Sequence, residues 1–237
     1  MVLPSSELGR VVFFPKSPVV LRCYTEAVRI LLATTNQGKL AELRQVMGER
    51  GIEVIGLSDS ASTQEIETGS TFAENALLKA RRYHRTSGLP TAADDSGLEV
   101  EALAGAPGVY SARYAGPLAD DAERIARLLD EMKDLSNSHR RARFTCAAAF
   151  VWEGGERVFV DQVQGVILTS ARGGNGFGYD PVFFYEPLGK TFAELTSSEK
   201  AGVSHRGLAF RRLAAWLSES GVLDTPGSGD RIVTTAD

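Results

Sequence analysis

The sequence predicts an α/β fold built on a mixed β-sheet, and three observations lead to that prediction. Strand-like and helix-like segments alternate along the first half of the chain. The second half changes to two long β-rich segments joined by the hairpin turn Glu153-Gly154-Gly155-Glu156. With 237 residues, the chain is long enough to bury a large core. We therefore expect two lobes with a cleft between them, rather than two independent domains.

The first half contains two strand–helix pairs. An apolar strand is predicted over residues 28–33, a helix over 39–49 that ends at Gly51, and a second strand over 53–57. The clearest helix covers residues 71–86, where Thr71 and Glu74 match a capping box and Gly88 ends the apolar stripe.

The remaining elements follow in order. A short strand over 91–93 runs into Asp94-Asp95, and a helix covers 119–135. The hairpin strands cover 143–152 and 157–168. A glycine-rich loop over 172–179, a strand over 182–185 and a helix from about 205 to 219, capped by Ser204, complete the chain.

The amino-acid composition indicates which partners and which cellular compartment to expect. The net charge of −4 provides no overall attraction to nucleic acid or to an anionic membrane, and we expect neither as a partner. The two cysteines are too few for a disulfide scaffold, so a cytoplasmic location is expected, with Cys146 as a buried thiol. We assign 1–27 to an irregular, partly disordered extension, 28–224 to a single domain and 225–237 to a flexible tail.

The turn after the first strand has the character of a phosphate-binding loop. Its residues are Thr34, Thr35, Asn36, Gln37, Gly38 and Lys39. Unpaired N–H groups at a helix N-terminus, together with the helix dipole, favour an anion, and Lys39 adds a positive charge. The loop is neither a Walker A motif nor GxGxxG. An ordinary strand–loop–helix unit with a solvated lysine is the alternative.

Two groups of carboxylates are candidates for a metal site. Asp94 and Asp95 should point to opposite sides of a continuing strand, so that one faces a ligand. A carboxylate near phosphates is repulsive unless a divalent cation lies between them, which implies Mg²⁺. Glu67 together with Asp95 would suffice as protein ligands. An Asp-rich turn and a solvated acidic loop around Glu65 are the structural alternatives.

Three further segments carry polar or aromatic groups suited to a nucleotide. Asn75 and Lys79 share one face of the 71–86 helix and would border the cleft; solvated Glu74 and Lys79 side chains are the alternative. Phe177 and Tyr179 directly precede Asp180 in a glycine-rich loop; aromatic rings stack on bases, although they equally stabilise loops. The last candidates offer hydrogen-bond donors near the start of the final helix: Lys200, Ser204, His205 and Arg206. We do not assign His205 as a base.

Six ordered motifs together resemble one known family. They are Thr34-x-Asn36-x-x-Lys39, Thr71-Phe72-x-Glu74-Asn75-Ala76, Ala93-Asp94-Asp95-Ser96-Gly97-Leu98, Gly105-x-Pro107-Gly108-x-x-Ser111-Ala112-Arg113-Tyr114, Phe177-Gly178-Tyr179-Asp180-Pro181 and Ser204-His205-Arg206-Gly207. Over about residues 29–218, the chain resembles the inosine triphosphate pyrophosphatase (Ham1-like, dITP/XTP pyrophosphatase) family.

The resemblance implies an ITPase-like (Maf/Ham1) two-lobed homodimer. It would hydrolyse ITP, dITP and XTP, with Mg²⁺, to the nucleoside monophosphate and pyrophosphate. Two alternatives stay open: a pyrophosphatase for modified pyrimidine nucleotides, and a non-catalytic nucleotide-binding regulator, which would not need Glu67 and Asp95 together.

The resemblance also implies roles for individual residues. Asp95 would be the proton acceptor and, with Glu67, a metal ligand. The triphosphate would lie on residues 34–39, and Ser96 would touch the substrate. The base and phosphate pocket would be lined by Phe177, Gly178, Tyr179, Asp180, Lys200, His205 and Arg206, with Asn75, Lys79 and Asp94 in support.

Overall fold

The computed structural model describes residues 29–57 and 68–223. The extension predicted for 1–27 and the tail predicted for 225–237 lie outside the described residues, as do Glu65 and Glu67. Among the described helices, none combines the length and apolar character needed to cross a membrane.

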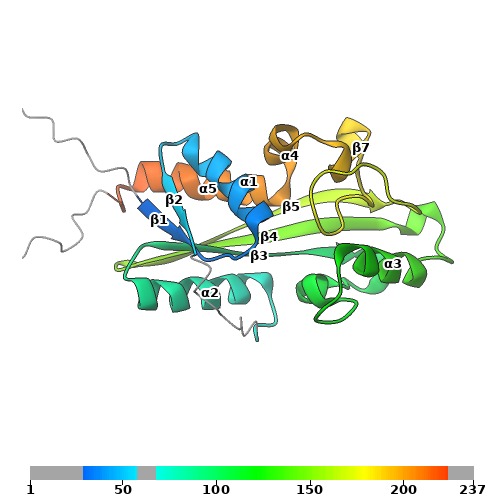
Figure 1. Ribbon diagram of the computed structural model, residues 1–237, viewed down its shortest axis with the longest axis horizontal. Helices are drawn as coiled ribbons and strands as arrows, with labels where there is room; N and C mark the ends of the chain where they lie inside the picture. The colour runs from blue at the N-terminus through cyan, green and yellow to red at the C-terminus, as the bar shows by residue number, and fades with distance from the viewer. Residues whose placement is uncertain (1–28, 58–67, 224–237) are drawn as a thin grey trace, which may run out of the picture.

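Within the described residues, one seven-stranded sheet forms the centre of the molecule, in the order β2-β1-β3-β4-β5-β6-β7 (Figure 1). Strands β2, β1 and β3 are parallel, and each later neighbour is antiparallel. The strands are β1 (Arg29–Leu32), β2 (Glu53–Gly56), β3 (Thr91–Val100), β4 (Arg141–Trp152), β5 (Gly155–Ile167), β6 (Phe183–Tyr185) and β7 (Lys190–Thr191). The prediction of an α/β fold with a mixed sheet is therefore confirmed.

Helices cover both faces of this sheet. In Figure 1, α1 and α5 lie on one face and α2 lies on the other, while α3 lies toward the far end of the long strands. The helices are α1 (Gln37–Gly48), α2 (Phe72–Ser87), α3 (Asp121–Glu131), α4 (Ser197–Val203) and α5 (His205–Ser220). Short 3₁₀ helices are η1 (Glu101–Leu103), η2 (Gly108–Arg113), η3 (Asn137–His139), η4 (Glu186–Leu188) and η5 (Phe192–Glu194).

The core divides into three clusters that follow this arrangement. Under α1 and α5, Leu43, Phe150 and Phe210 are among the buried side chains. Under α2, the cluster includes Ala76. A third cluster toward the other end of β3–β5 contains Leu128 of α3. Because β4 has 12 residues and β5 has 13, these strands run through both ends of the molecule.

The sequence interpretation was wrong about the length of β3. A short strand was predicted over 91–93, with an Asp-rich turn as one alternative for the residues directly after it. The strand instead continues to Val100, and β4 pairs with all ten of its residues. Aspartate and glycine are poor strand formers, but tertiary pairing overrides a propensity that spans only about 1 kcal/mol.

Helix ends also differ from the prediction. Helix α1 begins at Gln37 rather than at residue 39, because the Asn36 side chain caps it. The capping box at Thr71 is only half present: the Thr71 hydroxyl accepts from Glu74 N, while the Glu74 carboxylate accepts from Ser70 N at 2.8 Å. Helix α4 was not predicted, because it has only seven residues.

Candidate functional site: a cavity at the open edge of β3

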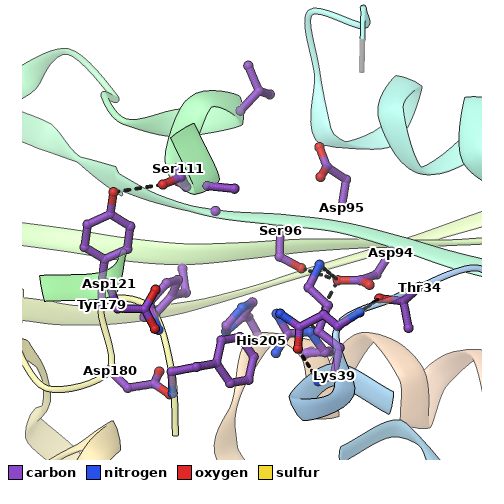
Figure 2. Close-up of a pocket in the computed structure, with 18 of the residues that line it drawn as sticks. Thr34, Lys39, Asp94, Asp95, Ser96, Ser111, Asp121, Tyr179, Asp180 and His205 are labelled. Carbon is purple, nitrogen blue, oxygen red and sulfur yellow. Dashed lines mark hydrogen bonds and ion pairs between the residues drawn. The ribbon is translucent and has the colours of Figure 1, made fainter. Parts of the chain in front are cut away.

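The site lies where β1 ends and β3 continues beyond it. Of the residues of β3, only Thr91 and Ala92 pair with β1, so the next residues of β3 have an uncovered edge. Pairing on this side resumes at Leu98, whose N–H donates to Ser111 Oγ at 2.9 Å. A cavity of about 290 Å³ occupies the gap, and side chains from both faces of β3 reach it (Figure 2). This geometry brings Asp94 and Asp95 to one cavity although they point to opposite sides of the strand.

Asp94 lies on the face of β3 that is covered by α1 and α5. Its Oδ2 atom lies 2.9 Å from Lys39 Nζ and 3.3 Å from Arg206 Nε. The same oxygen accepts from Ser96 Oγ at 2.8 Å. Although burial acts against ionisation, these cations hold the pKa of the Asp94 carboxyl well below its ordinary value. Asp94 is therefore an anion that joins β3 to both helices.

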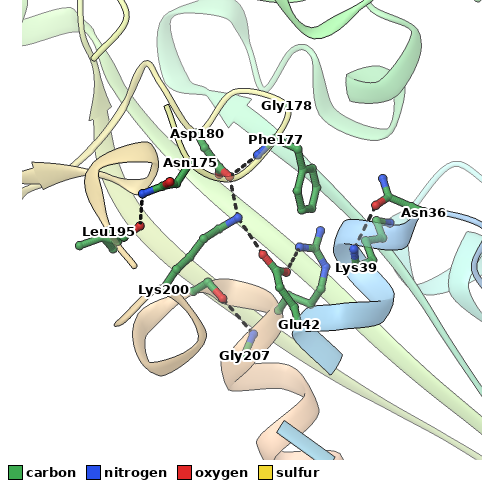
Figure 3. A network of polar contacts seen from close by, with 12 residues as sticks. Asn36, Lys39, Glu42, Asn175, Phe177, Gly178, Asp180, Leu195, Lys200 and Gly207 are labelled. Atoms are coloured by element: carbon green, nitrogen blue, oxygen red, sulfur yellow. Dashed lines mark hydrogen bonds and ion pairs between the residues drawn. The ribbon is translucent and has the colours of Figure 1, made fainter. Parts of the chain in front are cut away.

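The charged network continues beyond Asp94 through Glu42 of α1. The Glu42 carboxylate accepts from Arg206 Nη1 at 2.7 Å and from Lys200 Nζ at 2.8 Å (Figure 3). Lys200 also lies 2.6 Å from Asp180 Oδ2. Burial raises the pKa of Glu42, but the charges of Arg206 and Lys200 outweigh it and the net pKa is lowered. Three carboxylates and three cations thus alternate along one chain of contacts, of which Lys39 and Glu42 are half-buried and the other four residues are buried.

Asp95 lies on the opposite face, against α2. Asn75 Nδ2 donates to Asp95 Oδ2 at 3.0 Å, and Lys79 Nζ lies 3.3 Å from Asp95 Oδ1. Asn75 and Lys79 are both buried, so the alternative of a solvated lysine is wrong at this position. Asn75 Oδ1 also accepts from Gly69 N at 2.8 Å, which ties Asp95 to the segment before α2. These contacts hold the Asp95 carboxylate in one orientation.

The predicted phosphate loop forms the N-terminal end of α1. Asn36 N donates to Thr34 Oγ1 at 3.2 Å, and Asn36 Oδ1 accepts from Lys39 N at 3.0 Å. The cap therefore satisfies one of the helix N–H groups on which an anion would depend. Gly38 permits a close contact: a Cβ atom there would lie 3.0 Å from the ring of Phe177.

The glycine-rich loop meets α1 through that ring. Phe177 lies with its ring centre 4.6 Å from Lys200 Nζ and 5.2 Å from Arg206 Cζ, in cation–π geometry. Asp180 Oδ2 accepts from Phe177 N at 2.9 Å, and Tyr179 donates its hydroxyl to Ser111 O at 3.0 Å. Tyr179 is buried, so it stabilises the loop as well as lining the cavity.

His205 is a neutral group at the floor of the cavity. Its ring stacks on Phe144 at 4.6 Å between centroids, and burial together with the charges of Arg206 and Lys200 holds its pKa well below the ordinary value. Among the residues that the structure describes, His205 Nδ1 and Asp94 Oδ1 are buried atoms without a hydrogen-bond partner. Such atoms are the ones that a bound ligand or water would satisfy.

Most of the candidates from the sequence come together in this cavity. Among its lining residues are Thr34, Thr35, Asn36, Lys39, Lys79, Asp94, Asp95, Ser96, Phe177, Gly178, Tyr179, Asp180, Lys200, His205 and Arg206. Gln37, Gly38 and Asn75 do not line it, although Gly38 contacts Phe177 and Asn75 contacts Asp95. Glu67 lies outside the described residues.

Four polar residues of the site were missed by the sequence interpretation. Glu42 links Lys200 to Arg206, and Ser111, Asp121 and Arg124 line the cavity. Ser111 stood within one of the quoted motifs but carried no assigned role. Asp121 and Arg124 gave no signal, because charges in the first turn of a helix are common on protein surfaces.

The donor groups at the cavity fit a hard cation only in part. Within residues 29–57 and 68–223, no three His, Cys, Asp or Glu side chains gather closely enough to hold a metal ion. Asp95 supplies carboxylate oxygens, the ligand type that Mg²⁺ takes, and Mg²⁺ commonly retains water in most of its positions. Asp95 with Glu67 is thus a chemically suitable pair.

Comparison with known proteins places the chain in a family. Residues 30–216 match the model of the Ham1 family. The chain belongs to the Ham1 family. A dITP/XTP pyrophosphatase of Streptomyces avermitilis is 46% identical over 195 residues, which cover 81% of this chain and 98% of that protein. One from Thermus thermophilus is 48% identical over 187 residues, or 78% and 90% of the two chains.

Solved structures of Ham1 proteins have the same fold. A HAM1 protein from Coxiella burnetii matches with a TM-score of 0.74 at 42% identity, covering 81% of this chain and 99% of that one. A nucleoside-triphosphatase / dITP/XTP pyrophosphatase from Mycobacterium abscessus matches with a TM-score of 0.64 at 46% identity, covering 80% and 98%. The resemblance that the six motifs carry is therefore confirmed at the level of the family.

Proposed function

We propose that this Ham1-family protein is a nucleoside triphosphate pyrophosphatase that hydrolyses ITP, dITP and XTP to the monophosphate and pyrophosphate. Its relatives from Streptomyces avermitilis and Thermus thermophilus bear the name dITP/XTP pyrophosphatase. The structural observation that supports the proposal most is that Lys39, Asp95 and Lys200 line one cavity. A cationic group for phosphates, a carboxylate for water and a donor for a base are then within reach of one nucleotide.

In the proposed reaction, Asp95 orients a water molecule and accepts its proton as the water attacks the α-phosphorus. Asn75 and Lys79 keep the carboxylate in position for that step. Lys39 offsets the negative charge that develops on the departing pyrophosphate. A Mg²⁺ ion, held by Asp95 and Glu67, would neutralise phosphate charge when bound.

Base selection is proposed to depend on hydrogen-bond donors at the other end of the cavity. Hypoxanthine and xanthine carry a 6-oxo acceptor where adenine carries an amino donor. Lys200 and His205 line the cavity and can donate to that oxygen. The Phe177 ring provides a face on which the base stacks. Guanine shares the 6-oxo group, and its 2-amino group would be left unpaired, which a buried site disfavours.

The decisive experiment is an incubation of the full chain with ITP and Mg²⁺, with products separated by chromatography. We expect IMP and pyrophosphate, rather than IDP and phosphate, and at least tenfold lower kcat/KM for ATP and GTP, about 1.4 kcal/mol of discrimination. Omission of Mg²⁺ with added EDTA should stop the reaction. Preference for dUTP or a methylated pyrimidine triphosphate would favour the pyrimidine alternative, and binding without turnover would favour the regulator.

We also propose that the protein acts as a homodimer, as the family resemblance implies, and that it does so in the cytoplasm, as its low cysteine content favours. Sedimentation of the purified full chain tests the first part: a mass of twice 25.5 kDa is expected. A monomer at micromolar concentration would contradict it.

A further inference from the structure

Helix α3 reaches the base-side loop through one carboxylate that belongs to none of the six motifs. Asp121, the first residue of α3, accepts a hydrogen bond from Gly178 N at 2.6 Å through Oδ2. Gly178 lies between Phe177 and Tyr179, and Asp121 lies beside the loop in Figure 2. A bond from a backbone N–H to an ionised carboxylate is of the charge-assisted kind, which is stronger than a neutral one.

The Asp121 carboxylate is itself held from the other side. Its Oδ1 forms an ion pair with Arg124 on the next turn of α3. Arg124 also donates through Nη1 to Ala112 O, at 2.9 Å, and to Ala119 O. Because the guanidinium is fixed by two carbonyl groups, it fixes the carboxylate in turn. Asp121 therefore cannot rotate away from Gly178 without losing its contact with Arg124.

The loop that Asp121 holds has empty space behind it. A second, more open hollow of about 520 Å³ lies between α3 and residues 173–178, and Ile125 and Leu129 are among its lining residues. Asp121, Phe177 and Gly178 line both this hollow and the main cavity. The loop therefore lies between two hollows, and Asp121 contacts it at the border of both.

Other anchors of the loop lie on either side of Gly178. The Tyr179 hydroxyl bonds to Ser111 O, and the Asp180 carboxylate bonds to Phe177 N. Through Asp180, the second of these ties Phe177 to α4, because Lys200 Nζ lies 2.6 Å from Asp180 Oδ2. The bond from Gly178 to Asp121 ties the loop to a different element, α3, which packs through Leu128 into the core cluster at the far end of the sheet.

We propose that Asp121 is a positioning residue for base recognition, which holds Gly178, and through it the ring of Phe177, at the base side of the cavity. This inference rests on the proposed function. Loss of the bond should weaken the binding of a purine nucleotide, while phosphate binding at Lys39 and proton transfer at Asp95 stay unchanged.

The test uses Asp121→Asn and Asp121→Ala in the full chain, with ITP and Mg²⁺. The asparagine keeps the size of the side chain but directs an amide donor at either Gly178 or Arg124. We expect the KM for ITP to rise about tenfold, the effect of losing one charged hydrogen bond, with kcat within about twofold. The Ki of inorganic tripolyphosphate, a competitor that has no base, should be unchanged.

Asp130→Asn is the matched control, because Asp130 lies on the same helix with a side chain 73% exposed. It should alter neither constant. An unchanged KM for ITP in Asp121→Ala, or an equal rise in the Ki of tripolyphosphate, would overturn the positioning role. If the wild-type protein released no pyrophosphate from ITP, the proposed function would fail and this inference with it, whereas normal wild-type kinetics with an unaffected Asp121→Ala would remove this inference alone.

Discussion

Two neighbouring aspartates of β3 have different surroundings on the two faces of the strand. On one face, Asp94 has a side chain 1% exposed and pairs with cations from two helices, α1 and α5. On the other face, Asp95 has a side chain 9% exposed and bonds to Lys79 and Asn75, both from α2. The first network extends through Glu42 to Lys200 and Asp180, whereas the second extends to Gly69 in the segment before α2.

Successive side chains of a strand point to opposite faces, so these two adjacent aspartates have different partners and different roles. Asp94 compensates the charge of Arg206, which cannot lose its proton in a protein. Asp95 faces Lys79 and the uncharged amide of Asn75. Removal of the first carboxylate should therefore mainly affect stability, and removal of the second should mainly affect turnover.

The largest effect is expected for Asp95→Asn. Turnover of ITP should fall by about 10²–10⁴-fold, because an amide cannot accept the proton of water. The unfolding free energy should fall by less than in Asp94→Asn, because the amide oxygen can still accept from one of the two donors, Asn75 Nδ2 or Lys79 Nζ. Steady-state kinetics and urea unfolding measure the two quantities. Retention of wild-type turnover would remove Asp95 from the role of proton acceptor.

The next largest effect is expected for Asp94→Asn. The unfolding free energy should fall by about 3 kcal/mol, because the buried Arg206 and the half-buried Lys39 then have one anion fewer. Urea unfolding of this variant beside Asp95→Asn tests the comparison directly. If Asp95→Asn were the more destabilising of the two, the assignment of charge compensation to Asp94 would be wrong.

The smallest effect concerns His205, on the same face as Asp94. Because its pKa is held well below the ordinary value, the unfolded chain binds a proton near pH 6.5 that the native protein does not bind. Stability should therefore fall as the pH falls through that value, by about 1 kcal/mol from this residue between pH 7.5 and 5.5. His205→Gln should remove that part of the pH dependence, as thermal unfolding at both pH values can measure. An identical slope in wild type and variant would contradict a neutral, buried imidazole.

Local patterns predicted the elements more accurately than their ends. The strand and helix around residues 28–49 were predicted because apolar periodicity is a local property. The extension of β3 through Gly97 was missed, because only pairing with β4 makes that stretch a strand. The close packing around Gly97 also depends on tertiary structure. A Cβ on Gly97 would lie 2.4 Å from Gly108 O, so a residue with a side chain would displace η2.

The amino-acid sequence by itself determined the alternating elements, the six motifs and the opposite directions of the two aspartates, because each of these depends on residues that are near one another in the chain. Tertiary structure alone decided that Lys39 pairs with Asp94, that Glu42 joins Lys200 to Arg206, and that Asp121 reaches Gly178. Such contacts span up to 164 positions of the chain, and no local pattern encodes them. They form because burial makes an unpaired charge costly, and the fold supplies each one with a partner from a distant segment.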